Sequence, residues 1–255
     1  MTALSVNLNK IALIRNAREG DYPSVSQHAA MCIAAGADGI TVHPRPDQRH
    51  IRASDCFELG ASLTREFNIE GNPFAGPMAS DRRGVADYPG FMAIARQVVP
   101  AQCTLVPDTH SQLTSDHGFD LERDGARLAP IVGELRSLGI RVSLFMDPDV
   151  HQIRLAASLG ADRIELYTGP FAAAWSEPER RDALFERYYR AACTAQELGL
   201  GLNAGHDLNL HNLAYFASRT PGLLEVSIGH AFTVDCIELG LAETVRRYQR
   251  CLGKA

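Results

Sequence analysis

Histidines, arginines and carboxylates directly follow several short apolar runs in this 255-residue sequence. GITVHPRPDQRH places His43 and Arg45 after one run, FNIEGNP places Glu70 in a second, and LNAGHD places His206 after a third. Histidine and glutamate can act as general acids or bases near neutral pH, and arginine binds phosphate and carboxylate groups. These residues therefore indicate proton-transfer chemistry on an anionic substrate.

Two further carboxylates lie in or beside apolar runs. Glu165 lies inside RIELYTG, where an unpaired carboxylate would be costly to bury. It is therefore expected either to be hydrogen-bonded inside an active site or to point to a helix interface, and we favour the first. Asp147, in FMDP, is expected to cap the next helix.

Short runs rich in Val, Ile and Leu alternate with segments of helical periodicity along the whole chain. The runs are LSVNLN, GITVHP, FNIEGNP, CTLVPD, RVSLFMD, RIELYTG, LGLNAGH and EVSIGH. Junctions such as SLGIRVSLF and SLGADRIEL place glycine at a helix end, two or three residues before the next strand. This alternation is typical of parallel strands joined by right-handed crossovers.

The sequence therefore predicts an α/β fold, a single (β/α)8 TIM barrel over residues 1–255 with extra short helices. A doubly wound sheet is the alternative, although no G-x-G-x-x-G follows the first run. Two long connections, KIALIRNAREGDYPS and DTHSQLTSDHGFD, are expected to carry function or a short helix.

The active site of such a barrel lies at the carboxyl ends of its strands. His43, Glu70, Glu165 and His206 belong to four different strands, so their side chains would meet in one cavity. Any one of them could be an ordinary residue of the barrel rim. A strand has no structural need for His or Glu at its end, however, and their coincidence predicts an active site.

Phosphate-binding groups are also expected at this rim. NAGHD and SIGHA each place Gly-His before a helix, and barrels often bind phosphate between the loops after strands seven and eight. Gly205 and Gly229 would let the backbone approach an anion closely. Arg18, Arg45 and His50 lie on two other loops. Basic groups on separate loops indicate substrates that carry two phosphates.

Composition argues against several classes of protein. A net charge of −5 gives no general attraction to nucleic acid or anionic membranes. No apolar run approaches the roughly 18 residues that span a bilayer, and the opening MTALSVNLNK lacks a signal-peptide pattern. The six cysteines include no C-x-x-C pair, as expected for reduced thiols. We therefore expect a cytoplasmic protein that binds neither nucleic acid nor membranes.

Metal and lysine chemistry have few candidate residues. His43 and Arg45 form an H-x-R pattern, whereas H-x-H would put two imidazoles on one side of a strand, so no metal site is expected. The only lysines are Lys10 and Lys254, and Lys10 alone is a plausible Schiff-base nucleophile.

The apolar runs and their flanking residues resemble the pyridoxine 5′-phosphate synthase family over nearly the whole chain. The matching segments are VNLNKIALIRNAR, AGADGITVHPRPDQRHI, FNIEGNP, TLVPD, IRVSLFMD, IELYTG, LNAGHDLN and EVSIGHA. The resemblance implies a (β/α)8 barrel, a homo-octamer, and no metal or organic cofactor. It also implies small phosphorylated substrates: 1-deoxy-D-xylulose 5-phosphate and 3-amino-2-oxopropyl phosphate would condense, releasing phosphate and water as the pyridine ring closes.

The resemblance also implies a role for particular residues. His43 and Glu70 match the family's proton acceptors, His206 its proton donor, and Glu165 a group that stabilises a transition state. Residues expected to bind the amino-ketone phosphate are Asn7, Arg18, Asp207, Gly229 and His230. Residues expected to bind the deoxyxylulose phosphate are Asn9, Lys10, Arg45, His50 and Thr114.

Three positions depart from the usual family pattern. Asn9 and Lys10 stand where Asp-His is usual, Asp207 stands where Gly is usual, and VPD replaces VPE. An amide and a cation remain at positions 9 and 10, so sugar-phosphate binding is expected to survive. The change at 207 would matter little if only its backbone contacts the ligand.

Two other functions remain open from the residues. A lysine Schiff-base aldolase on the same barrel would use Lys10 as its nucleophile. A non-catalytic sensor of phosphorylated ligands would keep the barrel without turnover. Binding alone would not need Glu70 and Glu165 beside anionic ligands, which argues against the sensor.

Overall fold

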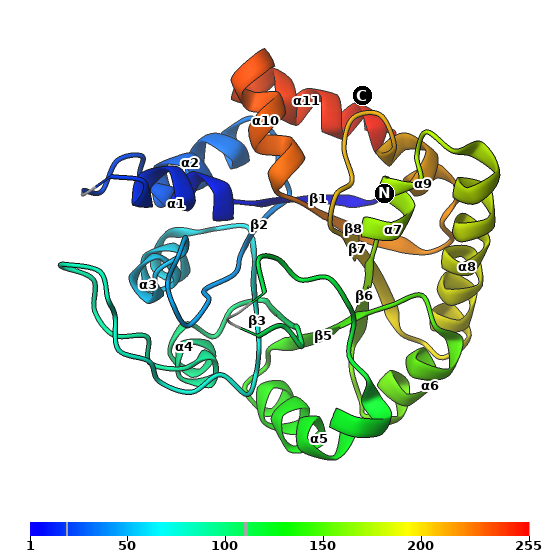
Figure 1. Cartoon of the computed structure of the whole chain (residues 1–255), viewed down its shortest axis with the longest axis horizontal. Coiled ribbons are helices and arrows are strands. Elements are labelled where there is room, and N and C mark those ends of the chain that lie inside the picture. Colours follow the sequence, from blue (N-terminus) through cyan, green and yellow to red (C-terminus); the bar gives the residue numbers. More distant parts are fainter. Residues whose placement is uncertain (19, 110–111, 255) are drawn as a thin grey trace.

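Eight parallel strands close into a barrel in the computed structural model, which describes residues 1–18, 20–109 and 112–254. Each strand pairs with the next one in sequence, and β8 pairs with β1 (Figure 1). The strands are β1 (Ala3–Asn7), β2 (Gly39–Val42), β3 (Glu66–Gly71), β4 (Gln102–Leu105), β5 (Arg141–Met146), β6 (Arg163–Tyr167), β7 (Gly201–Gly205) and β8 (Leu223–Ile228). The predicted (β/α)8 barrel is confirmed, and the doubly wound alternative is wrong.

Helices surround the barrel and outnumber its strands (Figure 1). They are α1 (Asn9–Asn16), α2 (Val25–Ala34), α3 (Ala53–Ser62), α4 (Phe91–Val98), α5 (Leu121–Ser137), α6 (Val150–Ser158), α7 (Gly169–Ala173), α8 (Pro178–Glu197), α9 (Leu213–Arg219), α10 (His230–Leu239) and α11 (Leu241–Cys251). The expected extra helices are therefore present. In the described part of the chain, no helix combines the length and apolar character needed to cross a bilayer.

The predicted glycine junctions end helices as expected. Gly139 and Gly160 have φ of 79°, in the left-handed region that favours glycine. The next amide, that of Ile140 after α5 or Ala161 after α6, donates back to the helix. The chain thereby reverses within a few residues and enters the following strand.

The main apolar core lies between the strands and the helices. Alternate residues of the strands, such as Val6 and Ile164, are fully buried and belong to this apolar core. The other set of strand residues is largely polar and buried, and includes Ser5, Thr41, Asn68, Thr104, Ser143, Glu165 and Asn203. Thr104 on β4 donates to Glu165 on β6, and Asn203 on β7 donates to Gln102 on β4. Because these hydrogen bonds join strands that are not neighbours, they cross the interior of the barrel.

Three long connections shape the carboxyl end of the barrel. The first long connection predicted from the sequence contains α1, and the second is the loop between β4 and α5. A third, residues 72–90 between β3 and α4, was not singled out in the sequence. Met78 and Tyr88 form an antiparallel bridge within it, and it projects beyond α3 and α4 (Figure 1).

A buried ion pair ties α1 to α3 beneath the loop that carries His50. Arg15 Nη1 lies 2.5 Å from Asp55 Oδ1, and Arg15 Nη2 lies 2.9 Å from Asp55 Oδ2. Both side chains are about 95% buried. Arg15 Nη2 also donates to the His50 carbonyl at 3.0 Å. The pair therefore fixes one wall of the predicted site.

We expect Asp55→Ala to lower the free energy of unfolding by about 3–5 kcal/mol, because it leaves the Arg15 charge buried without its partner. Glu134→Ala is the control, since it removes a bidentate partner of Arg96 at the surface and should cost only about 0–1 kcal/mol. Denaturant-induced unfolding measures both. Similar small losses in the two variants would contradict the structural role of Arg15 and Asp55.

Candidate active site

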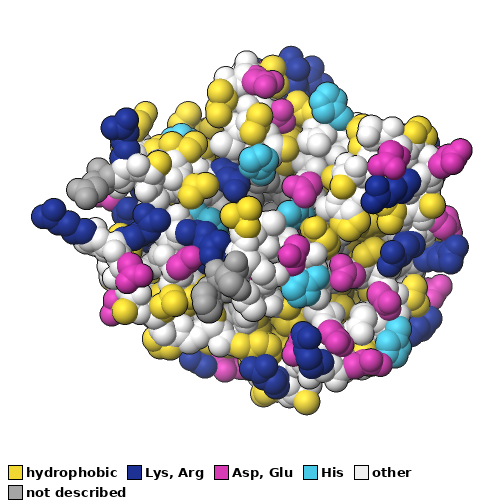
Figure 2. Space-filling model, in the orientation of Figure 1, with side chains coloured by type: hydrophobic (Ala, Val, Ile, Leu, Met, Phe, Trp, Pro, Cys, Tyr) yellow, Lys and Arg dark blue, Asp and Glu magenta, His cyan; other side chains and the backbone are white. Residues whose placement is uncertain are grey.

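A cavity of about 430 Å³ lies at the carboxyl end of the barrel. Every residue predicted to be catalytic or to bind substrate lines it, except Arg18, which is exposed just beyond α1. Gly205, expected to let the backbone approach an anion, does not line it either. Arg49, from the basic stretch GITVHPRPDQRH, also lines it, and the lining residues that the sequence did not indicate are Leu13, Val106, Leu113, Ser115, Phe145 and Ser227. Basic and histidine side chains gather near the centre of this face of the molecule (Figure 2).

His43 lies between two carboxylates just after β2. Its Nδ1 is 3.7 Å from Glu70 Oε2, and its Nε2 is 3.5 Å from Asp108 Oδ2. Burial, and then the charges of Arg45 and Arg49, hold the pKa of His43 well below its ordinary value. A neutral imidazole can accept a proton, so the environment suits the predicted role of His43.

Glu165 is buried and Glu70 is largely buried, and each carboxyl group has a raised pKa. Burial raises the pKa of Glu70 to about 8, and the charge of Asp108 contributes. Burial and the charge of Glu70 raise the pKa of Glu165 well above its ordinary value. Asn7 Nδ2 donates to Glu70 at 3.3 Å, and Thr104 Oγ1 donates to Glu165 at 3.4 Å. At neutral pH this pair therefore holds protons that ordinary carboxyls would have lost.

Asp108 contacts His43 and Arg45 from behind the lining of the cavity and is not among the predicted site residues. It forms an ion pair with Arg45 and accepts from Ser115 Oγ at 3.1 Å. Arg45 Nη1 also donates to the Thr109 carbonyl at 3.1 Å and to the Gln112 carbonyl at 3.2 Å. Arg45 therefore joins the loop after β2 to the loop after β4. The only sequence signal for Asp108 was its position at the exit of the run TLVPD.

His206 follows β7 and is held from both sides of its ring. Its Nδ1 lies 2.8 Å from Asp207 Oδ2, and its Nε2 lies 2.8 Å from Thr114 Oγ1. Tyr167 packs against the ring edge-to-face, with 5.1 Å between the ring centroids. Residues from β6, the loop after β7 and the loop after β4 thus meet at one imidazole.

Asn9 and Lys10, which depart from the usual family pattern, both interact with other residues of the site. Asn9 Oδ1 accepts a hydrogen bond from the backbone N–H of His43 at 2.9 Å, and an amide oxygen meets that need as a carboxylate oxygen would. Lys10 lies in the first turn of α1. Burial is the main reason that the pKa of His50 is lowered, and the hydrogen bond to His206 is the main reason for Asp207, and the charge of Lys10 contributes to both. A cation therefore still contributes to the field at this edge of the cavity.

Two glycines at the rim leave room for other groups. A Cβ at Gly205 would lie 2.3 Å from Glu165 Oε1, so any other residue there would displace the carboxyl group from its present position. Gly229 is the N-cap of α10, and His230 begins the helix. Backbone N–H groups at a helix N-terminus favour an anion, and anion binding at Gly229 and His230 stays a prediction.

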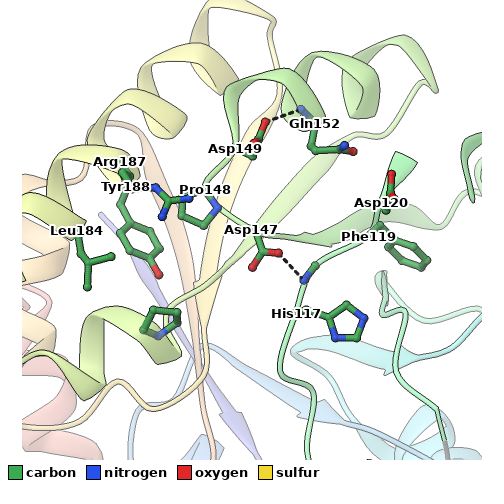
Figure 3. A pocket seen from close by; sticks show the side chains of 12 residues that line it. His117, Phe119, Asp120, Asp147, Pro148, Asp149, Gln152, Leu184, Arg187 and Tyr188 are labelled. Atoms are coloured by element: carbon green, nitrogen blue, oxygen red, sulfur yellow. Dashed lines mark hydrogen bonds between the residues drawn. The ribbon is translucent and has the colours of Figure 1, made fainter. Parts of the chain in front are cut away.

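A second cavity of about 410 Å³ lies between the loop that precedes α5, the loop after β5 and α8 (Figure 3). Its carboxylates are bound to backbone groups: Asp147 accepts from the Gly118 N–H at 3.2 Å, and Asp149 caps α6. The expectation that Asp147 caps the helix is therefore wrong, because Asp149 has that role. The two cavities have similar volumes, and the acid-base groups distinguish the one at the barrel mouth. Among residues 1–18, 20–109 and 112–254, no group of three or more His, Cys, Asp or Glu side chains is arranged to hold a metal ion.

A family model described as "Pyridoxal phosphate biosynthesis protein PdxJ" matches residues 4–254. The chain belongs to the PdxJ family. Pyridoxine 5′-phosphate synthase of Xanthomonas campestris pv. campestris (strain B100) is 56% identical to this chain over 251 residues, 97% of this chain and 94% of the relative. The Xylella fastidiosa (strain M23) protein of the same name is 51% identical and covers 97% and 93% of the two chains. The predicted family is thus confirmed, and the chain is an enzyme of pyridoxal phosphate biosynthesis.

Solved structures outside the PdxJ family share the barrel. N-(5′-phosphoribosyl)anthranilate isomerase from Pyrococcus furiosus has a TM-score of 0.56 at 11% identity, covering 99% of both chains. A thiamine phosphate pyrophosphorylase from Pyrococcus furiosus has a TM-score of 0.59 at 10% identity and covers 99% and 95% of the two chains. At such low identity these similarities establish the fold alone.

The raised pKa of Glu70 gives a pH-dependent contribution to stability. Between its ordinary value near 4.5 and about 8, the folded state keeps a proton that the unfolded state has lost. Stability therefore falls as pH rises through this window, by at most roughly 1.4 kcal/mol per pH unit for this group. We expect Glu70→Gln to gain stability relative to the unmodified chain between pH 5 and pH 8. Denaturant unfolding at the two pH values measures it, and a pH-independent difference would contradict the assignment.

Proposed function

We propose that this chain condenses 1-deoxy-D-xylulose 5-phosphate with 3-amino-2-oxopropyl phosphate to form pyridoxine 5′-phosphate, with release of phosphate and water. The observation that carries the proposal is the meeting of His43, Glu70, Glu165 and His206 in one cavity that also contains cationic groups. Membership of the PdxJ family and the names of its relatives support it.

The reaction needs repeated proton transfers, and the site offers groups with different protonation states. The amine of one substrate attacks the ketone of the other, so the Schiff base forms between substrates and no enzyme lysine is consumed. A neutral His43 can accept a proton, and Glu70 titrates near neutrality. The proposed role of Glu165 is to donate a hydrogen bond to an oxygen that gains negative charge, which suits a protonated carboxyl group. His206 is proposed to donate protons from the opposite side.

Two anion-binding regions are proposed at opposite edges of the cavity. One consists of Asn7 and the N-terminus of α10 at Gly229 and His230, for the amino-ketone phosphate. The other contains Arg45 and His50, for the sugar phosphate. His50 Nδ1 accepts from the Ile51 N–H at 2.9 Å, so the proton of the neutral ring lies on Nε2, where it can be donated to a phosphate oxygen.

Several expectations stay predictions. Arg18 lies outside the cavity, so its contact with the amino-ketone phosphate rests on the family resemblance alone. A homo-octamer rests on the same resemblance, and a cytoplasmic location rests on the composition of the chain. Family membership favours the synthase over the Schiff-base aldolase and the phosphate-ligand sensor.

We expect the purified chain to form pyridoxine 5′-phosphate only when both phosphates are present. His43→Ala and Glu70→Gln should each lower turnover by about 100-fold or more, since positioned acid-base groups contribute on the order of 10²–10⁴. Chromatographic detection of the product, with circular dichroism to establish folding, tests both points. A folded variant with near-normal turnover would remove that residue from the mechanism, and no product from the unmodified chain would reject the proposed reaction.

Lys10 distinguishes the synthase from the aldolase. As an electrostatic ligand it should tolerate Lys10→Arg, which keeps the charge, whereas Lys10→Ala should raise the KM for deoxyxylulose phosphate about tenfold or more through loss of a charge-assisted contact. Borohydride treatment in the presence of each substrate singly should leave Lys10 unmodified in a mass spectrum. A reduced adduct on Lys10, together with an inactive Lys10→Arg variant, would establish the aldolase instead.

A further inference from the structure

The loop after β7 contains two adjacent residues in a backbone conformation that favours glycine. His206 has a φ of 85° and Asp207 a φ of 61°. Residues with a Cβ seldom occupy this region, and when they do the strain is often found at functional sites. Both residues line the active-site cavity. Asp207 therefore adopts this backbone conformation at an energetic cost that glycine would not have.

The Asp207 carboxylate bonds to one side of the His206 ring, at 2.8 Å from Nδ1. On the other side, Nε2 faces Thr114 Oγ1 at 2.8 Å. The backbone is anchored as well, because Thr168 Oγ1 donates to the His206 carbonyl, and Asn209 and Asn212 donate to the Asp207 carbonyl. The ring is therefore fixed in both position and rotation.

This arrangement determines which ring nitrogen carries the proton. The bond to His206 lowers the pKa of Asp207 below its usual range, as do the charges of His230 and Lys10, so the carboxylate is ionised at neutral pH. An ionised carboxylate only accepts hydrogen bonds, which places a proton on Nδ1. In the neutral ring, Nε2 is then the acceptor and Thr114 the donor. In the protonated ring, Nε2 also carries a hydrogen, and this hydrogen points toward Thr114 and the cavity.

We propose that the Asp207 side chain is a positioning residue that holds His206 in the Nδ1–H tautomer, so that its proton transfers occur at Nε2. Proton transfer at Nε2 rests on the proposed function, in which His206 donates protons to the substrate. The tautomer is a property of the chain without substrate. Asp207 thus has a role beyond the ligand contact expected from its position in the family pattern.

The tautomer can be measured directly with 15N-histidine-labelled protein and long-range 1H–15N correlation spectra at a pH where the ring is neutral. His206→Gln identifies the His206 signals. We expect Nδ1–H in the unmodified chain, and a shift toward the Nε2–H form in Asp207→Gly. Glycine is free to adopt φ near 61°, so this variant should fold. Asp207→Asn keeps an acceptor oxygen and should largely preserve the Nδ1–H form.

Asp116→Asn is a matched control, because Asp116 Oδ1 bonds to Nδ1 of its neighbour His117 at 2.6 Å outside the active-site cavity. This substitution should change the signals of His117 and leave those of His206 unaltered. The Nε2–H tautomer at His206 in the unmodified chain, or an unchanged tautomer in Asp207→Gly, would overturn the proposal.

Kinetics test the catalytic half of the proposal. Asp207→Gly should lower kcat by about tenfold or more, a part of the 10²–10⁴ that a positioned acid-base group supplies, with a smaller effect on either KM. Asp207→Asn should recover much of that loss. A larger effect on KM than on kcat would show that Asp207 acts on binding and overturn its positioning role. If the unmodified chain forms no pyridoxine 5′-phosphate, the proposed function fails, while the tautomer measurement still decides the structural half.

Discussion

The burial of Glu70 and Glu165 in one cavity is the constraint on which the rest of the site depends. Burial raises the pKa of both groups, and a nearby negative charge adds to it, that of Asp108 for Glu70 and that of Glu70 for Glu165. Polar side chains in the barrel interior donate hydrogen bonds to these carboxyl groups. Thr104, for example, donates to Glu165. Glycine at position 205 leaves the space that the Glu165 carboxyl occupies. A purely apolar barrel interior would offer these carboxyl groups no hydrogen-bond donors.

The same constraint explains the cations at the mouth of the barrel. Asp108 adds negative charge beside Glu70, and Arg45 forms an ion pair with Asp108. Burial, and then the charges of Arg45 and Arg49, lower the pKa of His43, while Asp108 lies 3.5 Å from the other side of the ring. The protonation states of Glu70, His43 and Asp108 therefore depend on one another and on the charge of Arg45. A substitution of any one of these side chains alters the protonation of the others.

The sequence predicted the parts of this structure that depend on local patterns. Alternating strands and helices established the barrel, and residues at strand ends converged because parallel strands place all their carboxyl ends on one side. It did not reveal Asp108 as a partner of His43 and Arg45, or Thr114 as a partner of His206, because those contacts depend on how separate loops fold over one another. Arg18 matched a family position, but the fold places it outside the cavity.

Lys10 and Asp207 both depart from the usual family pattern, and their opposite charges act on each other. A carboxylate at Asp207 adds negative charge near the N-terminus of α10, where a phosphate is proposed to bind, and by itself would repel that phosphate. Lys10 lies on the same cavity, and its positive charge acts on Asp207, as does that of His230 when protonated. The lysine offsets the added carboxylate, so the net charge at this edge is balanced while the carboxylate remains available to His206. The charges of Lys10 and Asp207 therefore oppose each other at this edge of the cavity, while the Asp207 carboxylate orients the His206 imidazole.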